Sequence, residues 1–212
     1  MLPGPNIVIA CPKCGALAQY GTLLSGNTFG ARVWSDGKPD APMMPRPPQF
    51  VHCHGCGRVY ALGDAREIGK ADWNGKSDNP EWAAAPLVAE PDESAYYDAI
   101  ALCPADDAAT LEKLRFFAWW RHNDAYRGDG PPAVGASADP RWRDNAEAFF
   151  ATLGDSTEER FVGVELLRQL GRRAEALGRL NSIEDYEDIK AALRALCESG
   201  DTQVRELKFS NL

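Results

Sequence analysis

The 212-residue chain contains no apolar run near the roughly 18 residues that a membrane-spanning helix requires. Its first residues, Met1 to Pro5, carry no charged segment and no long apolar stretch. A secretory signal peptide needs both features. The sequence therefore predicts a cytoplasmic protein with no membrane association.

Short motifs of the common enzyme classes are also missing. The patterns H-E-x-x-H, G-x-S-x-G and G-x-x-x-x-G-K-[ST] do not occur. Gly26 and Gly30 are not followed by the Gly-Lys pair or the helix start that a phosphate-binding loop needs. These absences favour a protein that is not an enzyme.

Positive charge is scarce in the C-terminal part of the chain. The whole sequence has 23 Lys/Arg and 31 Asp/Glu, a net charge of −8. Residues 1–80 carry 8 basic and 6 acidic side chains (+2), whereas residues 81–212 carry 15 and 25 (−10). An acidic body repels phosphate backbones, so general nucleic-acid binding is disfavoured, and a basic partner protein would suit it.

Four of the six cysteines form two short pairs, each followed by glycine. The pairs read C-P-K-C-G at residues 11–15 and C-H-G-C-G at residues 53–57. Two intervening residues let both thiolates of a turn face one ion, and the glycine permits the positive φ of a tight turn. Two such pairs complete a closed four-thiolate site without an open position, which is typical of structural metal sites. The predicted ligands are Cys11, Cys14, Cys53 and Cys56.

Disulfides and a redox dithiol are the alternatives to a metal site. Disulfides are rare in reducing compartments, and a redox C-x-x-C is expected beside a βαβ pattern rather than short strands. His52 and His54 flank Cys53. Because four thiolates saturate the ion, we expect these histidines at the surface or supporting the ligands. Cys103 and Cys197 are isolated and are expected to be small buried residues.

The C-P-x-C-G turn resembles the knuckles of zinc ribbons and rubredoxins, over roughly the first third of the chain. This resemblance implies a small β domain holding structural Zn²⁺, or iron in a rubredoxin-like electron carrier. The chain departs from the pattern in its long spacer, residues 15–52, and in having His54 where the first pair has Pro12.

The first 62 residues have short apolar runs that predict strands near residues 7–10, 16–24, 28–34, 49–52 and 58–62. Asp36-Gly37 predicts a hairpin turn, and the proline-dense residues 39–48 predict an extended loop. The insert between the cysteine pairs also holds candidate partner-binding side chains: Asn27, Arg32, Trp34 and Lys38. The structural alternative is that Phe29 and Trp34 build the core of the ribbon, while Asn27 and Asp36 serve turns.

Later segments have helical periodicity. Residues 64–90 read as a turn or short helix followed by a linker, and helices are predicted at 92–103, 106–127, 139–153, 156–171, 172–180 and 182–200, with a loop at 128–139. Residues 166–177 resemble the crossover of a tetratricopeptide helix pair. The prediction is an α+β protein with a zinc ribbon (1–80), a linker (81–90) and an all-α bundle of tetratricopeptide-like hairpins (91–212).

Three functions are compatible with this sequence. The first is a protein–protein adaptor stabilised by structural zinc, since the site is closed and catalytic motifs are missing. The second is a nucleic-acid-associated zinc-ribbon factor of the transcription or RNA machinery. The third is a rubredoxin-like electron carrier, which would bind iron.

Overall fold

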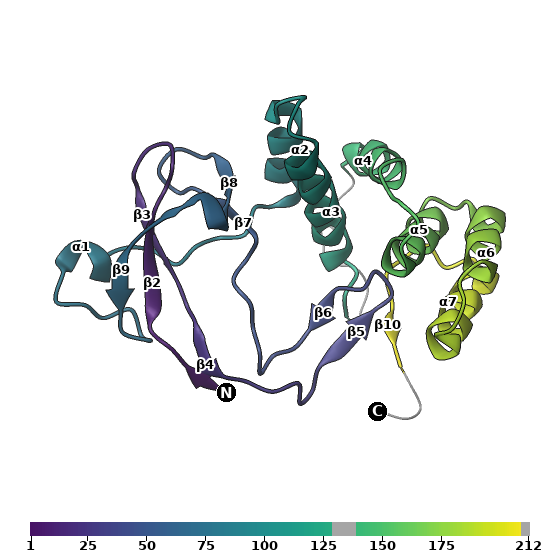
Figure 1. Cartoon of the computed structure of the whole chain (residues 1–212), viewed down its shortest axis with the longest axis horizontal. Helices are drawn as coiled ribbons and strands as arrows, with labels where there is room; N and C mark the ends of the chain where they lie inside the picture. Colours follow the sequence, from purple (N-terminus) through teal and green to yellow (C-terminus); the bar gives the residue numbers. More distant parts are fainter. Residues whose placement is uncertain (129–138, 209–212) are drawn as a thin grey trace. The chain divides into compact units, whose positions relative to one another are not determined.

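The computed structural model describes residues 1–128 and 139–208, and it is an α+β structure made of α-helices and small antiparallel sheets (Figure 1). The loop predicted at 128–139 lies almost entirely outside these residues. The chain forms two compact units. The ribbon unit comprises residues 1–31 and 41–95, and the helical unit comprises residues 32–40 and 96–212. Because the chain passes between them at three places, no single cut separates the two units.

The central strand of the ribbon unit is β2 (Asn6–Ala10), which pairs antiparallel with β3 (Leu17–Tyr20) and β9 (Arg66–Ala71) in the order β3-β2-β9. All five residues of β2 are buried. A strand paired on both edges and buried throughout needs a continuous apolar run, which Ile7-Val8-Ile9-Ala10 supplies. The strand predicted at residues 7–10 is confirmed.

Two smaller sheets complete the ribbon unit. β7 (Phe50–His52) pairs with β8 (Val59–Ala61), and β1 (Leu2–Pro3) pairs with β4 (Leu23–Ser25). The strand predicted over residues 16–24 is therefore divided between β3 and β4. A 3₁₀ turn (Leu62–Asp64) joins β8 to β9.

The prediction of a turn or short helix followed by a linker was wrong for residues 66–71, which form β9. Its sequence, R-E-I-G-K-A, is mostly charged and contains glycine, so it lacks the usual composition of a strand. Gly69 suits this position because a Cβ there would collide with the indole ring of Trp82 unless that ring moved. Trp82 belongs to the short helix α1 (Pro80–Ala83), so part of the expected linker packs against the ribbon sheet.

Among the described residues, six helices lie wholly or mostly in the helical unit, and α5, α6 and α7 pack side by side (Figure 1). They are α2 (Glu93–Leu102), α3 (Ala108–Asp124), α4 (Arg141–Phe150), α5 (Thr157–Gln169), α6 (Arg173–Asn181) and α7 (Glu187–Ser199). One apolar cluster joins α5, α6 and α7 around Leu167, Leu180 and Leu193. A second joins α3, α4 and α5 around Trp119 and Phe149. No helix within residues 1–128 and 139–208 is both long and apolar enough to cross a membrane.

Helix boundaries follow local capping chemistry in one case and depart from it in another. The capping box at Ser156 and Glu159 starts α5 as predicted. The cap predicted at residues 182–185 was wrong, because α7 begins after Tyr186, whose φ is +58°. Ser182 instead donates its hydroxyl to the Arg179 carbonyl at the end of α6. Buried Ile183 then fixes the chain in the core before α7 can start.

A hairpin from the spacer between the cysteine pairs belongs to the helical unit. β5 (Arg32–Trp34) and β6 (Pro39–Asp40) flank the predicted turn, where Gly37 has φ +77°. β5 also pairs with β10 (Glu206–Leu207) near the C-terminus. The expected ribbon included residues 32–40, but the structure groups them with the helices.

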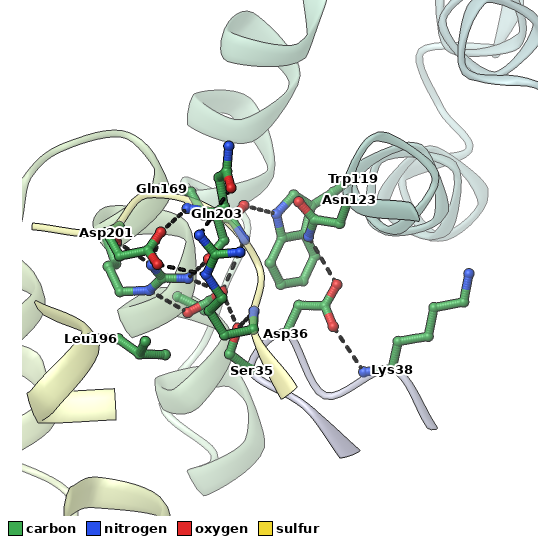
Figure 2. Close-up of polar contacts among 12 residues, drawn as sticks. Ser35, Asp36, Lys38, Trp119, Asn123, Gln169, Leu196, Asp201 and Gln203 are labelled. Carbon is green, nitrogen blue, oxygen red and sulfur yellow. Dashed lines mark hydrogen bonds and ion pairs between the residues drawn. The ribbon is translucent and has the colours of Figure 1, made fainter. Parts of the chain in front are cut away.

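Buried polar side chains join this hairpin to α5 (Figure 2). The Ser35 hydroxyl donates to Glu165 Oε1 at 2.7 Å, and it accepts from the Arg205 backbone N–H at 3.0 Å. The carboxylate of Glu165, which is fully buried, also accepts from Arg168 and Gln169. A buried carboxylate is stable only when it is paired and hydrogen-bonded, and Glu165 meets both conditions.

The hairpin turn makes a second set of contacts, with α3 and the residues after it. Asp36 Oδ2 accepts from Asn123 at 2.8 Å, and Asp36 Oδ1 accepts from Arg127 Nη1 at 3.0 Å. Lys38 Nζ lies 2.6 Å from Asp124 Oδ1. Burial lowers the pKa of Arg127, but the carboxylates of Asp36 and Asp124 outweigh this effect and raise it. The turn is thus held by paired charges inside the helical unit.

Candidate metal centre

Four cysteine side chains converge at one end of the ribbon unit. The sulfurs of Cys11, Cys14, Cys53 and Cys56 all lie within 4.8 Å of one another. Cys14 and Cys53 are separated by 3.6 Å, and Cys11 and Cys56 by 4.0 Å. A tetrahedral ion with metal–sulfur bonds of about 2.3 Å spaces its sulfurs about 3.8 Å apart. The four predicted ligands are therefore placed where they can bind one metal ion.

Each half of the site is a tight turn at the end of a hairpin. Cys11 and Cys14 lie between β2 and β3, and Cys53 and Cys56 lie between β7 and β8. Gly15 N–H donates to the Cys11 carbonyl and Gly57 N–H donates to the Cys53 carbonyl, with φ of +73° and +69° at the two glycines. Side chains other than glycine rarely adopt this conformation. The glycine after each pair is thus required by the turn.

The two pairs share an inside–outside asymmetry. Cys11 and Cys53 are 3 % exposed and pack with Val51 and Tyr60, whereas Cys14 and Cys56 are exposed. An ion bound by all four sulfurs would have an apolar wall on one side and water on the other. Burial and the neighbouring cysteine sulfurs raise the pKa of Tyr60 to about 12, so its hydroxyl stays protonated at neutral pH.

Backbone N–H groups lower the pKa of the two inner cysteines, Cys11 and Cys53, whereas burial raises it. Burial tends to raise the pKa of Cys11, but hydrogen bonds from the backbone of Cys14 and Lys13 outweigh it and lower the pKa to about 7. At Cys53 burial dominates over the backbone donors of Cys56 and Gly55, and the pKa rises to about 12. One inner thiolate therefore forms readily near neutrality, while the other keeps its proton until an ion displaces it.

Acidification is expected to weaken metal binding. The ligands must be thiolates, so protons compete with the ion and the association constant should rise with pH between about pH 6 and pH 8. With Cys53 protonated and Cys11 partly protonated near neutrality, binding should release more than one proton per ion. Calorimetric titrations in buffers of different ionisation enthalpy would count these protons. Affinity that does not change with pH would contradict thiolate ligation.

The two flanking histidines differ in their contacts. His52 Nε2 lies 3.0 Å from the Gly57 carbonyl oxygen. A carbonyl oxygen only accepts, so this nitrogen carries the proton and His52 supports the second turn, as expected for a residue that supports the ligands. His54 is exposed, in agreement with the surface alternative. Neither histidine belongs to the metal-ligand cluster found among the described residues.

The remaining candidate residues do not gather at the cysteines. Trp34 is 3 % exposed within the helical unit, and Lys38 is paired with Asp124. Arg32 is exposed and pairs with Asp40. Asn27 accepts from the Phe29 N–H in an exposed turn, as the structural alternative predicted. That alternative was wrong for Phe29, which is 85 % exposed. Partner binding by these side chains stays a prediction.

The two isolated cysteines also lie away from the site. Cys197 is 1 % exposed in the apolar core of α5–α7, in agreement with its expected packing role. Cys103 is half-buried, and its thiol donates to the Asp107 carbonyl at 3.8 Å.

Sequence reasoning did not single out two residues near the site, Tyr60 and Gln19. Tyr60 contacts the inner cysteines, and its position in an alternating strand was the available signal. Gln19 is a 5 % exposed polar residue inside β3, and no local pattern marks it because its partners are distant in the chain.

Comparison with protein-family models, curated proteins and solved structures finds no match to this chain.

Proposed function

We propose that this protein is a protein-interaction module whose ribbon unit is stabilised by a structural zinc ion. The observation that carries the proposal is the cluster of four cysteine sulfurs within 4.8 Å, contributed by two glycine-terminated turns. Zinc accepts tetrahedral thiolate ligands, and a four-cysteine set leaves no position for water or substrate. This closed ligand set supports a structural role and a protein that is not an enzyme.

Four thiolates also accept iron, which would make the ribbon unit a rubredoxin-like electron carrier. The metal content of the purified protein distinguishes the two. We expect about one zinc per chain by elemental analysis and a colourless solution. Stoichiometric iron with a red colour would reject zinc and favour the electron carrier.

The helical unit supports the interaction role. Consecutive helices α5, α6 and α7 pack around a shared apolar cluster, with a turn between α5 and α6 where Gly171 has φ +78°. Such helical hairpins resemble tetratricopeptide pairs, which bind proteins. The interaction role proposed for this chain rests on that analogy. Three helices make only one and a half helix pairs, which is fewer than the roughly three repeats that a solenoid needs, so we propose a compact bundle.

Charge indicates what kind of protein would bind. Residues 32–40 and 96–212 contain 17 Lys/Arg and 23 Asp/Glu, a net charge of −6. An acidic segment at the start of α7 is exposed: Glu184, Asp185 and Tyr186 lie in the loop before the helix, and Glu187 and Asp188 lie in its first turn. The Tyr186 side chain is 55 % exposed. We propose that a basic partner protein binds this acidic segment, residues 184–188.

The test is capture of partners from native lysate, with and without nuclease, by the full chain and two variants. Glu184→Lys with Asp188→Lys reverses charge in the acidic segment, and Glu112→Lys reverses charge on the exposed side of α3 as a control. We expect discrete proteins that survive nuclease and are lost only with the Glu184→Lys, Asp188→Lys variant. Equal capture by this variant would reject the acidic segment as the binding surface, and partners that depend on nucleic acid would reject the adaptor function.

The nucleic-acid alternative has less support than the sequence indicated. The ribbon unit, residues 1–31 and 41–95, contains 6 basic and 8 acidic side chains, a net charge of −2. At the turns, exposed Lys13 and Arg58 would be offset by the charge of −2 that Zn²⁺ and four thiolates carry together. A phosphate backbone would therefore meet no net positive surface here.

A further inference from the structure

The two halves of the metal site do not share a sheet. The first cysteine pair belongs to the β3-β2-β9 sheet and the second to the separate β7–β8 sheet. Beyond the 3₁₀ turn that links β8 to β9 along the chain, something must hold the halves at the separation that one ion needs. Leu62 and Ala65 at that turn pack against the apolar clusters of both halves. Residues 85–89, part of the segment expected to be a linker, add hydrogen bonds to both halves.

This segment bonds to the first half through Gln19 of β3. The Gln19 backbone N–H donates to the Pro86 carbonyl at 2.8 Å, and its carbonyl accepts from the Val88 N–H at 2.9 Å. Its side chain donates to the Ala85 carbonyl at 2.7 Å and accepts from Asn6 Nδ2 at 3.0 Å. Gln19 is 5 % exposed, so these bonds are made away from water.

The same segment bonds to the second half. The His52 backbone N–H donates to the Ala89 carbonyl at 2.9 Å, one residue before Cys53. Between the two bonded ends, the half-buried Val88 side chain packs against both apolar clusters of the ribbon unit. One cluster contains Cys11 and Cys53, and the other contains Ile7, Ile9 and Ala18.

We propose that residues 85–89 are a clamp that presets the spacing of the two cysteine turns, with Gln19 as its main positioning residue. The inference rests on the proposed metal site, and it names the residues that set the affinity of that site for its ion. Ordering the turns before the ion arrives removes part of the entropy cost of binding. Residues that orient ligands without touching the ion commonly alter metal affinity by about 10- to 100-fold.

The variant test is Gln19→Leu, which keeps the side-chain size and removes the amide. Gln49→Leu is the matched control, because Gln49 is exposed and its side chain makes no hydrogen bond with any residue in 1–128 or 139–208. With Co²⁺ as the spectroscopic probe and Zn²⁺ in competition, we expect Kd to rise about 10- to 100-fold in Gln19→Leu and to stay unchanged in Gln49→Leu. The Co²⁺–thiolate spectrum should stay that of four sulfurs in both.

The outcomes separate the clamp from the metal site. Affinity within about threefold of the parent protein, together with a lowered unfolding midpoint, would make Gln19 merely structural and reject the clamp. No Co²⁺ or Zn²⁺ binding by the parent protein would instead reject the proposed zinc site. Val88→Ala, which keeps the backbone bonds, replaces Gln19→Leu if that variant does not fold, with the same direction expected.

Hydrogen exchange on the parent chain tests the clamp without any substitution. After chelation we expect the amides of Val88 and His52, which donate within the clamp, to exchange at least about tenfold more slowly than those of Gly15 and Gly57 in the turns. Simultaneous loss of protection at all four amides would show that the ion, and not the clamp, holds the halves together.

Discussion

Replacement of Cys11 or Cys56 with serine should abolish stoichiometric metal binding and destabilise the ribbon unit. Each change removes one of the four sulfurs that surround the proposed ion. An ion present at about 1,000-fold above its Kd adds about 4 kcal/mol to the free energy of unfolding, and this contribution would be lost. Elemental analysis would measure the metal, and thermal unfolding would measure the stability.

The helical unit should keep its secondary structure in these variants, because none of the four cysteines lies in residues 32–40 or 96–212. Far-UV circular dichroism should therefore retain its helical signal after metal loss. Cys103→Ser is the control, since Cys103 lies outside the cluster. Unchanged metal content and melting in Cys11→Ser would reject the site, and collapse of the helical signal would reject independent helical folding.

Asp36→Ala should destabilise the helical unit by about 3–5 kcal/mol, although Asp36 lies between the cysteine pairs in the sequence. The substitution leaves Arg127, whose side chain is 10 % exposed, without its most buried partner, and it also removes the acceptor of Asn123. A buried charge that loses its partner keeps its desolvation cost without compensation. Urea unfolding followed by circular dichroism at helical wavelengths would measure the effect.

Asp40→Ala is the matched control from the same hairpin. Asp40 pairs with Arg32, but their side chains are 36 % and 43 % exposed. Exposed ion pairs contribute at most about 1 kcal/mol, so this variant should unfold almost like the parent protein. Equal effects of Asp36→Ala and Asp40→Ala would mean that the buried contacts of the hairpin do not stabilise the helices.

Several features could be predicted from the sequence because they depend on local chemistry. The spacing of the cysteines and their following glycines determines the two turns, because tight turns depend on few neighbouring residues. The capping box at Ser156 and Glu159 determined the start of α5 for the same reason. Periodicity located the helices to within a few residues, since a helix is set by contacts three and four residues apart.

Pairing between residues that are distant in the sequence could not be predicted. β9 is a strand because β2 offers it an edge, and its own residues R-E-I-G-K-A do not indicate this. The ends of residues 85–89 bond to Gln19 and His52, which lie far away in the sequence. The prediction of consecutive domains likewise left residues 32–40 in the ribbon, because their pairing with β10 and with Glu165 joins residues that are distant in the sequence.

The sequence by itself determined the four sulfurs, the two turns that present them and the order of the helices. Each of these depends on residues that are neighbours along the chain. The tertiary structure alone decided how the halves of the metal site are joined and to which unit the hairpin belongs. Those outcomes depend on buried hydrogen bonds and charges between distant residues, such as Asp36 and Arg127, whose pairing only the folded chain selects.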